Sequence, residues 1–571
     1  MTSLTSQNNN NTTFNFQPNE NDIKGILALL EQTQSPDNNV QRQVFNQLKV
    51  LEQNKEFSLY LSFILSCTTD GQVGMVIRWQ AGNILKKLTR TVFTSLPGQA
   101  QDYIVNNSLQ SLCDQHRNIR RVSSSIITTA LEEQNEPFRR WPNLIKTLAN
   151  YTLNDTLHVV QGSFYCLSLI CEDSTRDLKH DPQKPLDQLI PHFIKYMGHT
   201  DGTIRQLSLI SLVNIIPYQC EAMDINLQEF LTALSPLTTD ANSKTRKYVC
   251  KALCELTRFN FNILIEMIEQ IITFMLNAMS DEDDEVVMEA CEFWTIYCEE
   301  GDEAYSVLDK YLPQLLPILI NKMTYSDEEL MDLPVDNVAD AHVADRTEDI
   351  APQHMKKNND EGGGGGGGGE EGEDDDDDEN NGNDDFGTYT IRKASAGAVD
   401  LLSTVRPDVM FPILLPLLEQ GFSLIQQHAN HDVEVNDKPI WLIIESFILL
   451  LGAISDGMAK KLKNTMISTL FPLLLKCCKH DRPLIRSISV WTLTKYTRLI
   501  CWTAKNLQNG GGPTVIFEPT LLVLLELMQD QVKKVCSFFI IFFSHLTHMI
   551  YIYIYKVYVS SQYFKLTTYL Y

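Results

Sequence analysis

The chain has 571 residues, 43% of them hydrophobic, and its 72 acidic and 47 basic side chains give a formal net charge of −25. This length exceeds what one compact core accommodates, and it predicts several domains or one elongated array. The acidic charge and the lack of a basic stripe argue against direct nucleic-acid binding. The sequence has no glycine-rich phosphate loop, HExxH or GxSxG motif, so we expect neither an enzyme nor a cofactor.

Cysteine usage and the first residues indicate a reducing compartment. The thirteen cysteines include no CxxC pair, and the closest helical pair, Cys250 and Cys254, lies among apolar residues as core cysteines do. We therefore expect no metal site. The chain opens with MTSLTSQNNNNTT, which has neither a basic nor an apolar signal region, so residues 1–20 are predicted to be a disordered polar tail rather than a secretion signal.

From residue 21 to residue 325 apolar residues recur at helical spacing, and the helices come in pairs. A Leu-rich helix with a Pro near its start, such as YLPQLLPILI at Tyr311, LIPHFIKYM at Leu189 and TLFPLLLKCC at Thr469, is followed by a polar turn and a second helix. The position just after the turn is occupied by Arg120, Val160, Arg205, Arg246 and Val287, at spacings of 40, 45, 41 and 41 residues. This period is typical of HEAT or armadillo repeats, whose stacked units form a superhelix.

Residues 326–387 interrupt this pattern with an acidic, low-complexity stretch. It holds 22 Asp or Glu against 3 Lys or Arg, and so contributes 3 − 22 = −19 of the net charge of −25. It includes the run Asp374, Asp375, Asp376, Asp377, Asp378 and Glu379, and eight glycines at 362–369. We expect a disordered loop inserted at the turn of one repeat, with a reach of roughly 40 Å as a flexible coil. It is either an inert solvated insertion or a switch.

The repeats resume from residue 388 to residue 535. The position after the turn is now occupied by Ile443 and Arg486, which are 43 residues apart, and Lys533 follows 47 residues later. The predicted fold is therefore all-α, a HEAT-repeat solenoid (an α–α superhelix) carrying one long disordered acidic loop.

Residues 536–571 do not resemble a repeat helix. These 36 residues include 12 aromatic side chains and no Asp, Glu, Gly, Pro or Ala. We interpret them as an aberrant tail of the kind that translated AT-rich noncoding sequence yields. The competing interpretation is a membrane anchor over Phe538–Val559, but His545, His548 and Lys556 leave no clean run of about 20 apolar residues.

Several sequence blocks resemble the transportins, karyopherin-β receptors that import cargoes with proline-tyrosine nuclear localisation signals. The resemblance spans about Asp22 to Val535 and rests on GNILKK at Gly82, RWPNLI at Arg140, LICEDS at Leu169, EACEFW at Glu289, MTYSDEEL at Met323, IRKASAGAVDLL at Ile391, ESFILLLGAISDGM at Glu445 and RSISVWTLTKYTR at Arg486. It implies capture of cargo in the cytoplasm, contact with nuclear-pore phenylalanine-glycine repeats, and release of cargo when GTP-bound Ran binds the N-terminal repeats. The receptor would shuttle between cytoplasm and nucleus without binding membrane or nucleic acid directly.

The resemblance also implies site residues. The family's pocket for the proline-tyrosine end of the signal matches Asp400, Leu449, Ile488 and Trp491, and Gly397 stands where the family has alanine. An acidic patch that contacts Ran in the family matches Asp281, Glu282, Asp283, Asp284 and Glu285, although acids at a helix start also serve as caps. The acidic run at 374–379 would be the switch that couples Ran to cargo, since its charge acts only at close approach.

Three other functions stay open. Transportins continue for several hundred residues beyond the equivalent of Val535, so the chain is expected to lack much of the cargo surface and to bind cargo weakly, or to be a fragment that does not transport. A HEAT scaffold or regulatory subunit of a multiprotein complex shares the same repeat. Another karyopherin-β with different cargo is the nearer alternative.

Overall fold

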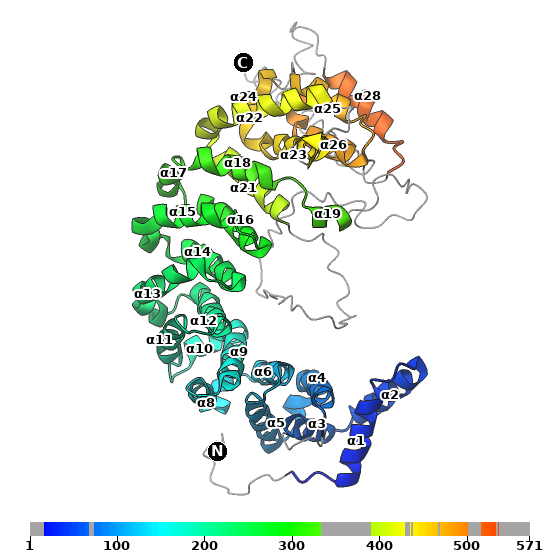
Figure 1. Ribbon diagram of the computed structural model, residues 1–571, viewed down its shortest axis with the longest axis vertical. Helices are drawn as coiled ribbons and strands as arrows, with labels where there is room; N and C mark the ends of the chain where they lie inside the picture. The colour runs from blue at the N-terminus through cyan, green and yellow to red at the C-terminus, as the bar shows by residue number, and fades with distance from the viewer. Residues whose placement is uncertain are drawn as a thin grey trace, which may run out of the picture. The chain divides into compact units, whose positions relative to one another are not determined.

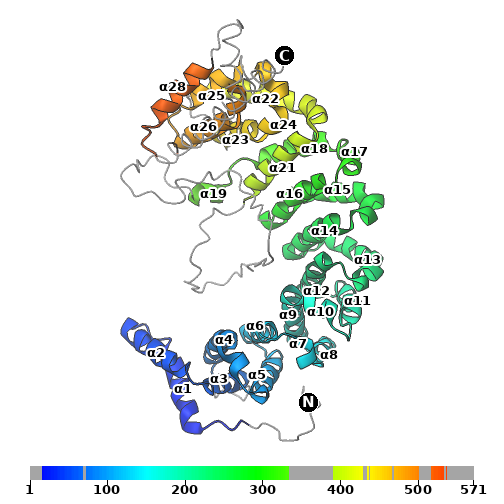
Figure 2. The same ribbon diagram turned by 180° about the vertical axis from the view of Figure 1, so that it is seen from behind.

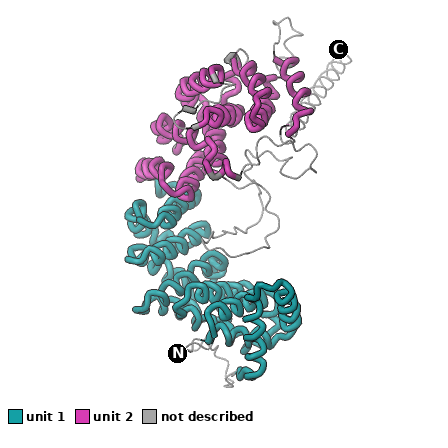
Figure 3. Tube along the Cα trace, turned by 45° about the vertical axis from the view of Figure 1, so that its right-hand side comes forward, with its two compact units in different colours: residues 1–266 teal, residues 267–571 magenta. Residues whose placement is uncertain are grey.

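The computed structural model describes residues 16–67, 73–332, 390–428, 434–435, 438–465, 469–500, 516–532 and 535. These residues are almost entirely helical, which confirms the predicted all-α class. The strands within these ranges are β1 (Glu434–Val435) and β2 (Lys438–Pro439), paired antiparallel. The chain divides into two compact units, residues 1–266 and residues 267–571 (Figure 3).

Unit 1 consists of helix pairs in the predicted order. Its helices are α1 (Glu20–Gln32), α2 (Asn38–Leu51), α3 (Phe57–Ser66), α4 (Met75–Val92), η1 (Phe93–Ser95), α5 (Gly98–Ser111), α6 (Arg117–Glu132), α7 (Pro137–Arg140), α8 (Leu144–Tyr151), α9 (Leu157–Asp173), α10 (Thr175–His180), α11 (Leu186–Tyr196), α12 (Gly202–Ile215), η2 (Ile216–Tyr218), α13 (Glu221–Leu234), η3 (Ser235–Thr239) and α14 (Ser243–Leu264), with η4 (Ile265–Met267) at the border. The second helices α4, α6, α9, α12 and α14 pack in sequence against one another, and α3, α5, α8, α11 and α13 form the other layer (Figure 1).

Unit 2 continues the same two-layer arrangement (Figure 2). Its helices are α15 (Ile268–Ala278), α16 (Asp284–Glu299), α17 (Asp302–Leu308), α18 (Leu312–Lys322), α19 (Asp327–Asp332), α21 (Ile391–Val405), α22 (Pro407–His428), α23 (Ile440–Ala453), α24 (Ser455–Thr465), α25 (Phe471–Cys477), α26 (Pro483–Lys495) and α28 (Phe517–Leu527). The second helices α16, α21, α23 and α26 pack in that order, and α18 packs against α22 and α25 against α28 in the other layer.

The repeat position counted from the sequence is one structural position. Each of Arg120, Val160, Arg205, Arg246, Val287, Ile443 and Arg486 is the fourth residue of its second helix. Proline placement is less uniform. Pro313 and Pro472 lie in the first turn as expected, but Pro191 is inside α11, because that helix begins at Leu186.

Arginines at this fourth position join neighbouring repeats. Arg205 donates from Nε and Nη2 to both carboxylate oxygens of Asp240 in the next turn, at 2.6 and 2.8 Å, and Arg486 pairs with Asp530 at 2.7 and 2.9 Å in the same way. Arg78, at the fourth position of α4, contacts Asp114 at 2.6 Å. The contacts of Arg205 and Arg486 are bidentate, and all three arginines bind an aspartate of the next repeat, so they hold one repeat in register with the next.

The same arginines also satisfy the backbone of their own turns. Arg205 Nη1 donates to the carbonyls of His199 and Thr200, and Arg486 Nη1 donates to those of His480 and Asp481. The paired aspartates accept backbone N–H groups in return, as Asp240 does from Asn242 at 2.8 Å. Carbonyl and N–H groups of the turns that would otherwise be unpaired are thereby hydrogen-bonded.

Several predicted segments lie partly or wholly outside the described residues. The predicted loop at 326–387 begins with α19, whose start is a reciprocal cap in which Ser326 and Glu329 exchange hydrogen bonds. The rest of that loop, including Asp374 to Glu379, is outside the described part, as are Lys533 and residues 536–571. Most of the predicted tail at 1–20 is outside it too.

Two described segments are long and apolar enough to cross a membrane, judged by length and composition alone, namely Ser243–Ala278 and Pro407–Gln427. The first is not one straight helix, because Asn260 has non-helical φ and ψ of −137° and 29°. The second buries Met410, Leu414 and Leu418 at helical spacing within unit 2. Both segments are accounted for as repeat helices.

Replacing Arg205 by Met tests the inter-repeat contact. Burial alone would raise the pKa of Asp240, but the hydrogen bonds and charge of Arg205 outweigh it and hold that pKa below its ordinary value. With the Asp240 side chain only 3% exposed, we expect Arg205→Met to cost about 2–4 kcal/mol at neutral pH, measured by hydrogen exchange in α12 and α14. The loss should shrink as pH falls below the ordinary carboxyl range of about 4.

The control is Arg139→Met, which removes a pair with Glu136 three residues earlier, and these two side chains are 81% and 65% exposed. We expect that change to cost under about 0.5 kcal/mol. Equal effects of the two substitutions would contradict a structural role for the Arg205–Asp240 contact.

Candidate functional site

The four residues expected to bind a ligand lie on three consecutive second helices of unit 2. Asp400 is in the second half of α21, Leu449 is in α23, and Ile488 and Trp491 are in α26. Because α21 packs against α23 and α23 against α26, the structure places all four along one row of helices. The sequence resemblance therefore selects residues that the repeat fold brings onto neighbouring elements.

The three apolar members of this set are buried between the helices. Leu449 is 1% exposed, Ile488 0% and Trp491 4%. A Cβ added at Gly452 of α23 would lie 2.1 Å from Cζ3 of Trp491, so the indole ring lies directly against the α23 backbone. The resemblance matches Trp491 to a ligand pocket, and in the structure its ring is part of the interface between α23 and α26.

Charged side chains border the buried apolar residues. Lys495, one helical turn after Trp491, places its Nζ 5.5 Å from the centroid of the indole ring. Burial raises the pKa of Asp400 to about 6, the charge of Lys495 opposes that rise, and Asp456 at the start of α24 adds to it. Half-burial of the charged Asp400 carboxylate therefore lowers the stability of the fold. Such destabilising charged groups are typical of binding sites.

Gly397 leaves open space on α21, about one turn before Asp400. A Cβ built at Gly397 meets no heavy atom within 4 Å. Residues three apart on a helix are neighbours on its surface, so this space adjoins Asp400. The accessible part of the candidate site is therefore its polar edge, formed by Asp400 and Lys495 and open beside Gly397.

The acidic patch at 281–285 comprises the turn before α16 and the first two residues of that helix. Asp281 accepts the backbone N–H of Asp283 at 3.0 Å, and Asp283 is the N-cap of α16, accepting the N–H of Glu285 at 2.9 Å. Capping thus accounts for Asp281 and Asp283. Glu282 and Asp284 are exposed, so they are accessible to a partner.

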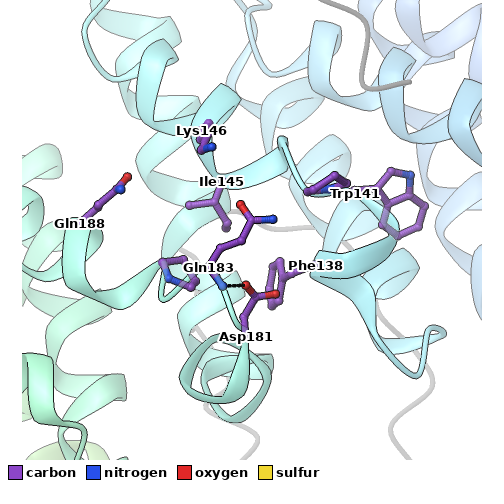
Figure 4. A pocket seen from close by; sticks show the side chains of 9 residues that line it. Phe138, Trp141, Ile145, Lys146, Asp181, Gln183 and Gln188 are labelled. Carbon is purple, nitrogen blue, oxygen red and sulfur yellow. Dashed lines mark hydrogen bonds between the residues drawn. The ribbon is translucent and has the colours of Figure 1, made fainter. Parts of the chain in front are cut away.

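A concavity in unit 1 was not anticipated from the sequence. About 390 Å³ of space, part of it open to solvent, is lined by Phe138, Trp141, Pro142, Ile145, Lys146, Asp181, Gln183, Pro185 and Gln188 (Figure 4). Trp141 is held by a hydrogen bond from Nε1 to Asp102 at 3.0 Å. The RWPNLI block, which carries part of the family resemblance, supplies three of these residues, Trp141, Pro142 and Ile145. No group of three or more His, Cys, Asp or Glu that could hold a metal occurs in the described ranges.

Relatives of known name share most of this chain. Transportin-1 of Mus musculus is 31% identical over 531 residues, which covers 92% of this chain and 56% of the relative. The transportin of Dictyostelium discoideum is 33% identical over 563 residues, covering 91% and 57%, and importin subunit beta-2 of Schizosaccharomyces pombe is 32% identical over 539 residues, covering 90% and 56%. The chain spans little more than half the length of these relatives. No protein-family model matches the sequence.

Solved structures confirm the fold. An importin-β crystallised from ammonium sulfate superposes with a TM-score of 0.62 at 16% identity, covering 90% of this chain and 55% of that one. Yeast importin-β, Kap95p, gives a TM-score of 0.60 at 17% identity, covering 91% and 55%. The fold is thus a HEAT-repeat solenoid of the importin-β type. The sequence identities, which extend over about nine tenths of the chain, show that it is a homologue of the transportins.

Asp400→Asn should make the protein more stable at pH 7. Because the pKa of Asp400 in the folded chain, about 6, exceeds the ordinary value of 3.8, the folded state loses stability as pH rises between these values. Asparagine removes that loss, and we expect a gain of about 1 kcal/mol at pH 7, reduced from the full linkage value because the side chain is partly exposed. Denaturant unfolding at pH 4 and pH 7 measures it.

The gain from Asp400→Asn should disappear near pH 4. The control is Asp408→Asn, because a hydrogen bond from Lys461 lowers the pKa of Asp408 and its neutral replacement should give no gain. A loss of stability in Asp400→Asn at pH 7 would show that the Asp400 carboxylate stabilises the fold.

Two glycine substitutions distinguish open space from close packing. Gly397→Ala should raise stability by about 0.5–1 kcal/mol, because alanine is the better helix former and its Cβ has room. Gly452→Ala should instead destabilise by about 1–3 kcal/mol, because its Cβ would clash with Trp491. Thermal unfolding of the two variants measures both effects, and similar shifts of the same sign would contradict the described packing of Trp491.

Proposed function

We propose that this protein is a nuclear import receptor of the transportin type. It binds the nuclear localisation signals of cargo proteins, crosses the nuclear pore and releases cargo when GTP-bound Ran binds. The observation that carries the proposal is the 31% identity to a transportin over 531 residues, a span that includes the repeats around the candidate site. The receptor would shuttle between cytoplasm and nucleus.

The cargo contact is assigned to Asp400, Leu449, Ile488 and Trp491, with a proline-tyrosine segment as ligand. The half-buried Asp400 carboxylate is a suitable acceptor for a tyrosine hydroxyl, because an acceptor already desolvated loses little more on binding. Since Trp491 is only 4% exposed, an incoming ring reaches it after Lys495 moves from the indole face. A half-buried lysine moves at small cost, so binding at this edge is an induced fit.

The Ran contact is assigned to the acidic patch Asp281, Glu282, Asp283, Asp284 and Glu285, and the switch to the acidic run Asp374 to Glu379. Solved relatives of the same fold include Kap121p bound to RanGTP, with a TM-score of 0.53, and a Kap95:Nup1 complex, with a TM-score of 0.58. These two complexes support Ran and a nuclear-pore protein as partner classes here, and the proposed contact with the pore is through phenylalanine-glycine repeats. Exposed Glu282 and Asp284 would face basic side chains of the GTPase.

A second candidate function is binding of the GTPase without transport of cargo. A HEAT scaffold would bind neither Ran nor a localisation signal.

Binding to Ran separates these functions. The full chain, immobilised at physiological salt, should retain Ran loaded with a non-hydrolysable GTP analogue in large preference to Ran loaded with GDP. A variant with Glu282 and Asp284 both replaced by Gln should retain less, because two exposed acids are lost while the caps at Asp281 and Asp283 stay. Circular dichroism of the variant controls for folding. Equal retention of both nucleotide forms, or none by folded protein, would favour a scaffold.

A further inference from the structure

A buried ion pair joins α21 to α23 a short distance from the candidate site. Nη2 of Arg392 lies 2.5 and 2.6 Å from the two carboxylate oxygens of Glu445, and the two side chains are 4% and 1% exposed. The ring of Tyr325 lies over the same guanidinium, 4.0 Å from its Cζ. Arg392 Nε is buried and has no hydrogen-bond partner among the described residues.

Stability does not account for this pair. Moving two charges out of water costs about as much as their attraction returns, and well-packed apolar residues in their place are often equally or more stable. The unpaired Nε adds a further cost of about 1–3 kcal/mol. Because burial of this ion pair is energetically unfavourable, we expect the pair to have a role other than stabilising the fold.

The interaction energy of the ion pair depends strongly on geometry, unlike that of an apolar pair. A guanidinium and a carboxylate at 2.6 Å accept only a narrow range of relative positions, whereas apolar side chains slide past one another with little change in energy. Because one partner is on α21 and the other on α23, the contact fixes the register of these two helices. Tyr325 extends the contact to the chain just after α18.

Both helices carry candidate-site residues close to the pair. Arg392 is eight residues before Asp400, about 12 Å along the axis of α21. Glu445 is four residues, one turn, before Leu449 on α23, and seven residues before Gly452, on which Trp491 lies. A slip of α21 along α23 would therefore change the distance from Asp400 to the apolar wall.

We propose that Arg392 and Glu445 are positioning residues for the candidate site. The pair sets the register of α21 against α23, and through it the separation of Asp400 from Leu449 and Trp491. A ligand that engages the carboxylate and the apolar wall together depends on that separation. The proposal rests on the proposed function in one respect, the proline-tyrosine peptide used as ligand.

The test replaces the ion pair with apolar residues in the full-length chain. In the double variant Arg392→Met, Glu445→Leu no buried charge is left unpaired, so its denaturant midpoint should stay close to that of the wild type. Its affinity for a fluorescent peptide ending in Pro-Tyr should nevertheless fall about 10-fold or more, as expected for a misplaced binding group. Fluorescence anisotropy measures the affinity, and unchanged affinity with unchanged stability would overturn the proposal.

Two further variants keep the test decisive. Arg392→Lys preserves the charge but not the fork geometry, so it should bind the peptide more weakly than wild type even if the double variant folds poorly. The control variant, Lys479→Gln with Glu526→Gln, removes an exposed pair of unit 2, 56% and 62% exposed, and should bind like wild type. Binding by Arg392→Lys equal to that of the control would also overturn the proposal.

A readout without peptide separates failure of this proposal from failure of the proposed function. If wild type does not bind the peptide, the cargo assignment is wrong, but the register can still be followed at Trp491. With 5-fluorotryptophan incorporated, the ¹⁹F signal of Trp491, assigned with Trp491→Phe, should shift in the double variant and not in the control. An unshifted signal would show that the pair does not position this part of the site.

Discussion

The contacts that set the register of neighbouring repeats are made by an arginine at the fourth position of a second helix, namely Arg78, Arg205 or Arg486. In one side chain it pairs with the aspartate of the next turn and binds the carbonyls of its own turn, as Arg205 does with Asp240 and with His199 and Thr200. A repeat cannot bury its apolar faces alone, so stability resides in the interfaces between repeats. Apolar stacking alone lets neighbouring helices slide past one another, and directional contacts at those interfaces fix their register. A site with residues from several second helices requires that register.

In the candidate site, the packing of the second helices leaves some side chains accessible and buries others. Three second helices supply an acid, a base and an apolar wall, but the wall is part of the helix packing because Gly452 lets Trp491 approach the α23 backbone. The polar edge stays accessible, with Asp400 held half-buried at a raised pKa and space open beside Gly397. A fold optimised only for stability would have neither the desolvated acid nor the helical glycine. Both residues lower stability, as residues of a binding surface often do.

Much of the fold could be predicted because the repeat period is a local pattern. A single position counted through the chain is the fourth residue of seven second helices, from Arg120 to Arg486. The burial of Trp491 was not predictable, since it depends on a glycine 39 residues away in another helix. The same holds for Arg392 and Glu445, which are 53 residues apart and look like ordinary surface charges in the sequence. Pairings across helices are set by three-dimensional packing, for which a periodic pattern carries no signal.

The Arg392–Glu445 pair and the Arg205–Asp240 pair use the same chemistry for different ends. The second lies at a turn, 17% and 3% exposed, where water can satisfy what the pair leaves open. The first lies between two helix bodies, where no turn carbonyls compensate the guanidinium and its Nε is left unpaired. Since apolar residues in place of a buried ion pair are often equally stable, we attribute its presence between the helices that carry Asp400 and Leu449 to the geometry of the site. The arginine–aspartate pairs at the turns align successive repeats. The Arg392–Glu445 pair aligns α21 with α23, and so the surface that these two helices form.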